Sequence, residues 1–339
     1  MRYAGAVLHV GGASQRNFAV ESQDMLLLKV CATNGTVAWA RTWNGPADRY
    51  DEIDGIIVED GYVYVSGWAD ITTDYTAGDI ALVKFTEDGA FVADTLWGGA
   101  GREEANEAMA SDGTNLYVTG VVDGINLFSG GDAVVVAFDQ ASLTEVWNRT
   151  WGGAQVDDGY GLTLQNGSLY VTGLTTSFGG DRIFLLKYDV EGNRISDGTW
   201  GAAGAESARS VGVTGNGSFV YIAGKTNSYG NGSFDVLLLR DDQTGGLGWF
   251  RTWGGTGSDA SHGLAVASDA LYVVGETGSL GRGGTDVLLL RIGLDGQPSL
   301  PGGPPAASGG AVVIVVAAVV VAGIIIGVFL IRRRRHPPA

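Results

Sequence analysis

Residues 249–296 read WFRTWGGTGSDASHGLAVASDALYVVGETGSLGRGGTDVLLLRIGLDG, and this stretch decides the fold because its parts recur along the chain. It holds three landmarks: a Trp-Gly-Gly turn, an aromatic and β-branched segment ending in Gly, and an Asp followed by an apolar run. Self-similarity at a period of about 20 to 50 residues is typical of repeat architectures. The remaining sequence is therefore interpreted by locating the same landmarks.

The three landmarks keep step with one another over most of the chain. The Trp-Gly-Gly turn, with variants, recurs at spacings of 54, 54, 49 and 53, at Trp43, Trp97, Trp151, Trp200 and Trp253. The aromatic segment ends at Gly12, Gly67, Gly120, Gly173, Gly224 and Gly275. The apolar run follows Asp24, Asp79, Asp132, Asp181, Asp235 and Asp286. These positions define a true repeat of roughly 50 residues, in which Trp and Asp have structural roles.

Each repeat reads as four short strands. The first is light, as in Gly263–Ala267, the second is aromatic, and the third is continuously apolar, which predicts burial on both faces. The fourth carries two Trp residues four positions apart, such as Trp147 and Trp151, so both should pack on the same neighbour. We predict an all-β fold, a β-propeller of about six four-stranded blades. A two-layer sandwich is the alternative, but it has no reason to repeat so regularly.

The first and last blades should be incomplete. The sequence holds six segments of strand two and of strand three, but five of strand one and of strand four. We expect blade one to lack its first strand and blade six its fourth. An upstream segment containing one of each would close the ring, and a further upstream blade is an equally open alternative.

The pattern W-x-R-T-W-G-G, an acidic residue, G-L-A-V, then L-Y-V-T-G-x-T-x-S-F-G-G-x-D-x-L-L-L-K resembles the SBBP β-propeller repeat. Residues 151–192 and 249–296 show it most fully, and the resemblance covers about residues 6–296. The strand L-Y-V-T-G also resembles the YVTN propeller repeats of surface-layer proteins. The resemblance implies a bacterial or archaeal cell-surface protein, often with a C-terminal anchor, and it supplies no catalytic motif.

The C-terminal part predicts a membrane anchor. Residues 1–296 form the propeller repeats, and residues 297–310 are a stalk rich in Pro, Gly and Ser. Residues 311–331 contain no charged side chain and are long enough for a transmembrane α-helix. The basic tail, 332–339, should then be cytoplasmic and the propeller extracellular, on a single-pass cell-membrane protein. Met1–Val10 is a poor export signal, so we suspect an upstream start; a tail-anchored cytoplasmic propeller is the alternative.

Composition narrows the possible partners. The chain has 37 acidic and 21 basic residues and a net charge of −16, which excludes a general nucleic-acid binder. Its single cysteine, Cys31, excludes an intrachain disulfide. If the propeller is extracellular, five sequons are possible glycosylation sites, although Asn-Gly-Ser also forms good turns: Asn34, Asn148, Asn166, Asn216 and Asn231.

Two acidic sets are candidate sites. The Asp that precedes each strand three could bind Ca²⁺, but a role repeated in every blade is more easily structural, fixing the strand entry. The second set follows the Trp-Gly-Gly turn and should gather on one face, as a negative funnel or a solvated rim: Asp51, Glu52, Glu103, Glu104, Asp157, Asp158, Glu206 and Asp259. Within it, Asp157, Asp158 and Asp259 are weak metal candidates.

No catalytic constellation stands out. Asp259, Ser261 and His262 include the residue types of a triad without its required arrangement. Residues 241–249 match the tryptophan-docking motif of quinoprotein propellers, but no cofactor-binding set accompanies it. We therefore predict a noncatalytic binding or scaffolding domain without a cofactor, whose partner is an extracellular protein or glycan. The alternatives are a surface-lattice component, or a Ca²⁺-dependent or quinoprotein-like enzyme.

Overall fold

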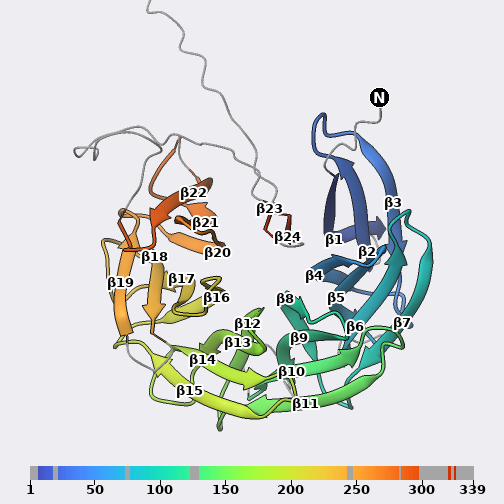
Figure 1. The fold of residues 1–339 in the computed structure, drawn as a ribbon, viewed down its shortest axis with the longest axis horizontal. Helices are drawn as coiled ribbons and strands as arrows, with labels where there is room; N and C mark the ends of the chain where they lie inside the picture. Colours follow the sequence, from blue (N-terminus) through green and yellow to red (C-terminus); the bar gives the residue numbers. More distant parts are fainter. Residues whose placement is uncertain are drawn as a thin grey trace, which may run out of the picture.

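The computed structural model describes residues 7–17, 22–72, 77–122, 130–242, 247–281 and 284–297, with the short pairs 320–321 and 324–325. Six antiparallel sheets surround a central opening, as Figure 1 shows. This arrangement is a β-propeller, and it confirms the predicted all-β class. We number its blades 1 to 6 in chain order.

Every sheet follows the chain from one strand to its neighbour. The strands of blades 1 to 3 are β1 (Val7–Asn17), β2 (Ser22–Cys31), β3 (Val37–Trp43); β4 (Asp51–Glu59), β5 (Tyr62–Asp70), β6 (Gly78–Thr86), β7 (Phe91–Trp97); β8 (Glu104–Ser111), β9 (Asn115–Val122), β10 (Asp132–Asp139) and β11 (Glu145–Trp151). Those of blades 4 to 6 are β12 (Asp157–Gln165), β13 (Ser168–Thr175), β14 (Arg182–Asp189), β15 (Arg194–Trp200); β16 (Glu206–Val213), β17 (Val220–Thr226), β18 (Asp235–Asp241), β19 (Leu247–Trp253); β20 (Asp259–Val266), β21 (Ala270–Thr277) and β22 (Asp286–Gly293).

The first strand of each complete blade is innermost and the fourth forms the outer rim (Figure 1). Because neighbouring strands run antiparallel, the turns from strand four to strand one lie at the same end of the ring as the loops from strand two to strand three. We call this the Trp-Gly-Gly end. The turns within blades, from strand one to two and from three to four, lie at the opposite end.

Blades 1 and 6 each have three strands in the described part of the chain. Blade 1 begins with the strand that pairs as strand two, and blade 6 ends with strand three, as the repeat count predicted. Neighbouring blades pack through strand one of the later blade, as β8 does on β4, β5 and β6. No packing of this kind joins blade 6 to blade 1 among the residues described, and Figure 1 shows the ring open there.

The core is divided among the junctions between blades. Each of the five described junctions holds its own cluster of buried apolar side chains. Strand three contributes to both of its flanking junctions, and in β10 every residue from Ala133 to Phe138 is buried. Trp147 and Trp151 pack in the same junction, which confirms that both Trp residues of a fourth strand face one neighbour.

The glycine landmark of strand two lies within the strand, as Gly67 does in β5, and is required by a close backbone approach. A Cβ at Gly67 would overlap the carbonyl oxygen of Glu52 on strand one, and one at Gly120 would overlap that of Glu104. The same overlap occurs at Gly173, Gly224 and Gly275. This landmark of the repeat therefore marks the place where strand one bends toward strand two.

The predicted stalk, transmembrane helix and basic tail lie outside the described residues, apart from two short strands. These are β23 (Val320–Val321) and β24 (Ile324–Ile325), which pair antiparallel. Within the residues that the structure describes, no helix has the length and apolar character needed to cross a bilayer. The helix at 311–331 stays a prediction.

Candidate functional site

An irregularity recurs in every inner strand. One residue is left over in the pairing of strand one with strand two, between Ile53 and Gly55, Gly159 and Gly161, Ala208 and Ser210, and Ser261 and Gly263. The residues at these β-bulges are Asp54, Tyr160, Arg209 and His262. In β8 the irregular stretch is longer and spans residues 106–108. β-Bulges redirect side chains and are frequent beside functional sites, so these residues define the candidate site.

The acid at the start of each inner strand is buried and serves the fold. Asp157 is completely buried and accepts hydrogen bonds from the Gly153 amide at 2.7 Å, from the Ser177 hydroxyl at 2.6 Å and from the Thr175 hydroxyl. Asp51, Glu103, Glu206 and Asp259 likewise accept an amide hydrogen bond from the Trp-Gly-Gly turn. These five buried acids of the second set therefore form neither the predicted negative funnel nor the alternative solvated rim.

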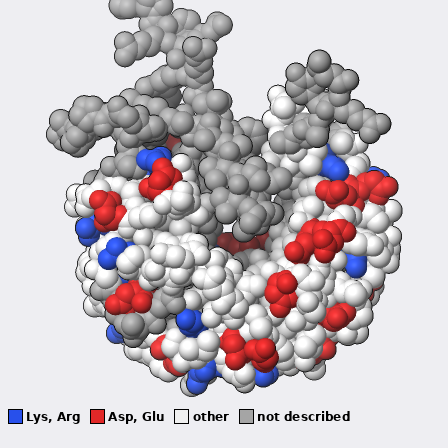
Figure 2. Space-filling model, viewed as in Figure 1, with Lys and Arg blue, Asp and Glu red and all other residues white. Residues whose placement is uncertain are grey.

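The next residue along each strand points to the opposite side, because side chains alternate on a strand. Glu52, Glu104 and Asp158 occupy this position in blades 2, 3 and 4, and all three are partly exposed. Figure 2 shows acidic side chains at the central opening on the face drawn. These residues are the part of the second acidic set that gathers on one surface.

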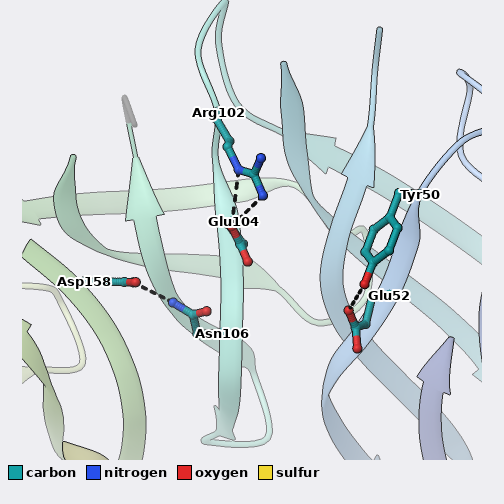
Figure 3. A network of polar contacts seen from close by, with 6 residues as sticks. All are labelled: Tyr50, Glu52, Arg102, Glu104, Asn106 and Asp158. Carbon is teal, nitrogen blue, oxygen red and sulfur yellow. Dashed lines mark hydrogen bonds and ion pairs between the residues drawn. The ribbon is translucent and has the colours of Figure 1, made fainter. Parts of the chain in front are cut away.

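Three polar pairs from blades 2, 3 and 4 lie near one another at this surface (Figure 3). The Tyr50 hydroxyl donates to Oε2 of Glu52 at 2.8 Å, and Nη2 of Arg102 lies 3.2 Å from Oε2 of Glu104. The Asn106 amide, on the irregular stretch of β8, donates to Oδ1 of Asp158 at 2.6 Å. The guanidinium of Arg102 also lies 4.3 Å from the ring of Trp68.

The second half of the site comes from blades 3, 4, 5 and 6. Nη1 of Arg209 donates to Oε1 of Glu107 at 3.0 Å, and its guanidinium lies 4.1 Å from the ring of Tyr160. Nε2 of His262, in blade 6, lies 3.7 Å from Oε1 of Glu276. The side chains of Glu107 and His262 remain accessible to a ligand, with exposed fractions of 36% and 49%.

Two carboxyl groups of the site have strongly raised pKa values. Burial is the main cause of the rise in the pKa of Asp54 to about 7, and the neighbouring charges of Glu52, Glu104 and Glu107 add to it. Burial also raises the pKa of Asp158 to about 7, and the charge of Glu104 adds to the rise. A hydrogen bond with Tyr160 lowers the pKa and offsets part of this effect. Near neutral pH these groups can both donate and accept hydrogen bonds.

The three metal candidates do not form one site. Asp157 and Asp259 each bond within their own blade, where hydroxyls of Thr277 and Ser279 lower the pKa of Asp259 despite its burial. Asp158 instead contacts Asn106. Among the residues described, no three His, Cys, Asp or Glu side chains are grouped to hold a metal ion.

In blades 2, 3 and 5 the Asp that precedes strand three lies beside the buried acid of the next blade. A Cβ at Gly98 would overlap the carboxylates of both Asp79 and Glu103. Asp132 and Asp157 meet in the same way at Gly152, and Asp235 and Asp259 at Gly254. The first glycine of the Trp-Gly-Gly turn thus leaves room for two carboxylates. Burial, with a contribution from Glu103, raises the pKa of Asp79 to about 6.

The other predicted positions are spread over the ring. Trp43 donates to Asp94 at 2.9 Å and Trp97 to Glu145 at 2.7 Å, so both tie one blade to the next. All five sequon asparagines are exposed, and Oδ1 of Asn34 and of Asn216 closes a turn. The center of the quinoprotein-like motif, 243–246, lies outside the described residues.

Sequence reasoning missed Asp54, Asn106, Glu107, Tyr160 and Arg209. A detectable signal existed, because Asp54, Asn106, Tyr160, Arg209 and His262 each stand three residues after the buried acid. Their differing chemistry hid them from a search for recurring residue types.

Comparison with known proteins supports no family assignment. No protein-family model matches the chain, and no curated protein matches it in sequence. The solved structure of a putative 6-phosphogluconolactonase from Bacteroides uniformis ATCC 8492 is 14% identical with a TM-score of 0.50, covering 86% of this chain and 80% of its own. The WD40 domain of Neurospora crassa Pan2 is 11% identical with a TM-score of 0.49; 74% of this chain aligns, spanning 64% of that chain. At such identities the likeness concerns the fold alone, and the SBBP resemblance stays a prediction.

Proposed function

We propose that this chain is a noncatalytic binding or scaffolding propeller, anchored in the cell membrane with its ring outside the cell. The β-propeller fold supports a binding role, because its loops and inner strands present side chains from several blades on a rigid ring. The uninterrupted apolar stretch 311–331 and the following Arg332–Arg335 support the anchor and its orientation.

The binding site is the set of bulged inner strands, and its partner is a basic segment of an extracellular protein. The observation that carries this proposal is the meeting of Glu52, Glu104, Glu107 and Asp158 from three blades on a partly exposed surface. Arg102 and Arg209 balance only part of this charge. Acidic concave surfaces attract cationic partners and accelerate their association.

A direct test is the titration of the full chain with a fluorescent pentalysine peptide at low salt, followed by anisotropy. The variant Glu52→Gln/Glu104→Gln should weaken binding about tenfold, the equivalent of roughly 1.4 kcal/mol. Asp60→Asn is the matched control: Asp60 is exposed in the turn between β4 and β5, at the opposite end of the ring. Equal losses in both variants would show general charge attraction and contradict a built site.

The orientation needs its own experiment. Protease added to intact cells should remove the propeller and leave a membrane-protected fragment containing Arg332–Arg335. Full protection of the propeller would instead support the tail-anchored cytoplasmic alternative.

Two further measurements separate the other functional alternatives. A melting temperature that rises with millimolar Ca²⁺ would favour the cation-dependent alternative, and ordered arrays in envelope preparations would favour the surface lattice.

A further inference from the structure

One carboxyl group of the candidate site lies among other carboxyl groups. Asp54 stands at the β-bulge of β4, partly exposed, and its side chain forms no hydrogen bond with the residues that the structure describes. The charges that act on it are all negative: Glu52 of β4, and Glu104 and Glu107 of β8 in the next blade. β4 also packs against β1, β2 and β5, but no described charged group of these strands acts on Asp54. Its charge therefore has no balancing cation.

The cations of the site are held by the acids of β8. Nη2 of Arg102 lies 3.2 Å from Oε2 of Glu104, and Nη1 of Arg209 lies 3.0 Å from Oε1 of Glu107. Each guanidinium also covers an aromatic ring, at 4.3 Å for Arg102 and 4.1 Å for Arg209. These contacts fix both arginines beside β8, away from the carboxyl group at the bulge of β4.

A second carboxyl group is placed so that it can change charge without breaking the contact between blades. Nδ2 of Asn106 donates to Oδ1 of Asp158 at 2.6 Å and to the carbonyl oxygen of Gly159 at 2.9 Å. This amide is a donor in both bonds, and a donor serves an ionised and a neutral carboxyl group alike. The charge of Glu104 opposes ionisation of Asp158, and the charge of Arg209 favours it. Asp158 can therefore gain a proton while its bond to Asn106 persists.

Crowded carboxyl groups cannot all stay ionised. Burial and neighbouring like charges both disfavour the charged form, so some members of such a cluster keep a proton to a higher pH than an isolated Asp does. The pKa values of Asp54 and Asp158, each about 7, agree with this geometry. The negative charge of the site therefore grows by up to two as the pH rises from about 6 to about 8.

We propose that the bulged inner strands bind their partner in a proton-dependent manner, holding a basic segment above neutral pH and releasing it on acidification. This inference rests on the proposed function, because it concerns the same site. A bound cation favours the ionised form of Asp54 and Asp158, so binding expels protons from them. Conversely, their protonation removes up to two of the charges that attract the partner. Binding should thus be strong above about pH 7 and weaken as the pH falls through this value.

One histidine of the site provides a competing explanation. His262 lies 3.7 Å from Oε1 of Glu276, and its charge also acts on Glu107. A histidine that gains a proton would repel a basic partner, which gives a pH dependence of the same sign. The groups that act on Asp54 and Asp158 come from blades 2 to 5, whereas His262 stands in blade 6. A histidine variant therefore separates the two explanations.

The test is titration of the full chain with the fluorescent pentalysine peptide at low salt, at about pH 8.5 and about pH 5.5. We expect the Kd to be at least about tenfold larger at the lower pH. Calorimetric titration at about pH 7, in phosphate and in Tris, gives a second readout, because these buffers differ in their heat of ionisation. Both carboxyl groups are about half protonated there, so binding should release roughly 0.5 to 1 proton per complex.

Three variants assign the titrating groups. Asp54→Asn/Asp158→Asn should remove both the pH dependence and the proton release, because neither amide titrates. His262→Gln should keep the ratio of the two Kd values. Asp79→Asn is the matched control: its carboxyl group also has a raised pKa, about 6, but lies beside Glu103 at the turn between blades 2 and 3, so the titration should be unchanged.

The outcomes separate this inference from the proposed function. Binding with the same Kd at both pH values would overturn the inference and leave the proposed function in place. A pH dependence that persists in Asp54→Asn/Asp158→Asn, or one that disappears in His262→Gln, would also overturn it, because other groups would then control binding. Absence of saturable binding at both pH values would contradict the proposed function and this inference together.

Discussion

Arg209 and Glu107 form an ion pair that connects blade 5 to blade 3 past the blade between them, with Nη1 and Oε1 3.0 Å apart. The guanidinium also covers the ring of Tyr160 from that intervening blade, 4.1 Å away. Three inner strands are thus connected at the centre of the ring by one side chain.

The first prediction concerns this connection. Replacing Arg209 by Met should lower the free energy of unfolding by about 1 kcal/mol, because it removes a partly exposed ion pair and a cation–π contact. Urea denaturation would measure the change. Arg194→Met is the matched control: its ion pair with Asp197 is more exposed and lies within a single strand, so we expect almost no effect. Equal losses in the two variants would contradict a special role for Arg209.

The second prediction concerns two adjacent acids with opposite roles. Asp157→Ala should destabilise the protein by about 2 to 4 kcal/mol, because it leaves an amide and two hydroxyls without their buried acceptor. Asp158→Ala should cost less than about 1 kcal/mol, since it removes a desolvated charge together with its hydrogen bond to Asn106. Thermal unfolding of both variants measures the difference. A larger loss in Asp158→Ala would refute the division between structural and site acids.

The third prediction concerns pH. Asp79, Asp54 and Asp158 have folded-state pKa values of about 6, 7 and 7, above the value of roughly 3.9 for an unfolded Asp. The folded state therefore binds protons more tightly, so these groups favour folding at low pH, and stability should fall as the pH rises from about 4 to 7. Melting temperatures across this range measure the slope.

The variant Asp54→Asn/Asp158→Asn provides the control for the pH series. It should flatten the decline, because neither amide titrates. An unchanged slope in the variant would assign the pH dependence to other groups.

The fourth prediction concerns the glycine of strand two. Gly120→Ala should destabilise the protein by about 1 to 3 kcal/mol, because its Cβ would overlap the backbone of Glu104. Gly99→Ala is the matched control, since open space surrounds a Cβ at that position. Differential scanning calorimetry should show a clear loss in the first variant alone. Similar melting temperatures for the two would mean that strand one can move away.

The sequence predicted the fold in detail because its landmarks recur. Trp147 and Trp151 pack in one junction, and the apolar run of strand three is buried, as the repeat predicted. Among the described residues, blades 1 and 6 have three strands each, which also agrees with the repeat count. The landmarks recur because every junction between blades needs the same packing. In every complete blade the glycine of strand two also lies close to the backbone of strand one.

The candidate site could be predicted only in part. Asp157 and Asp158 look equivalent in sequence, but because side chains alternate on a strand, Asp157 is completely buried whereas Asp158 is partly exposed at the central surface. Tyr160 and Arg209 are brought to the site by β-bulges. The position of each bulge depends on how strand one pairs with strand two, so it cannot be read from the sequence of strand one alone.

In strand four, a Trp and an Arg donate hydrogen bonds to the turn of the following blade, as Trp147 does to Val190, and these side chains also carry evolutionary information. They are present in blades 1, 3 and 5, whereas blades 2 and 4 have Ala93 with Thr95 and Ser196 with Gly198. An alternation of this kind is what successive duplication of a two-blade gene segment would leave behind. Blade sequences should then match better at an offset of two blades than at an offset of one.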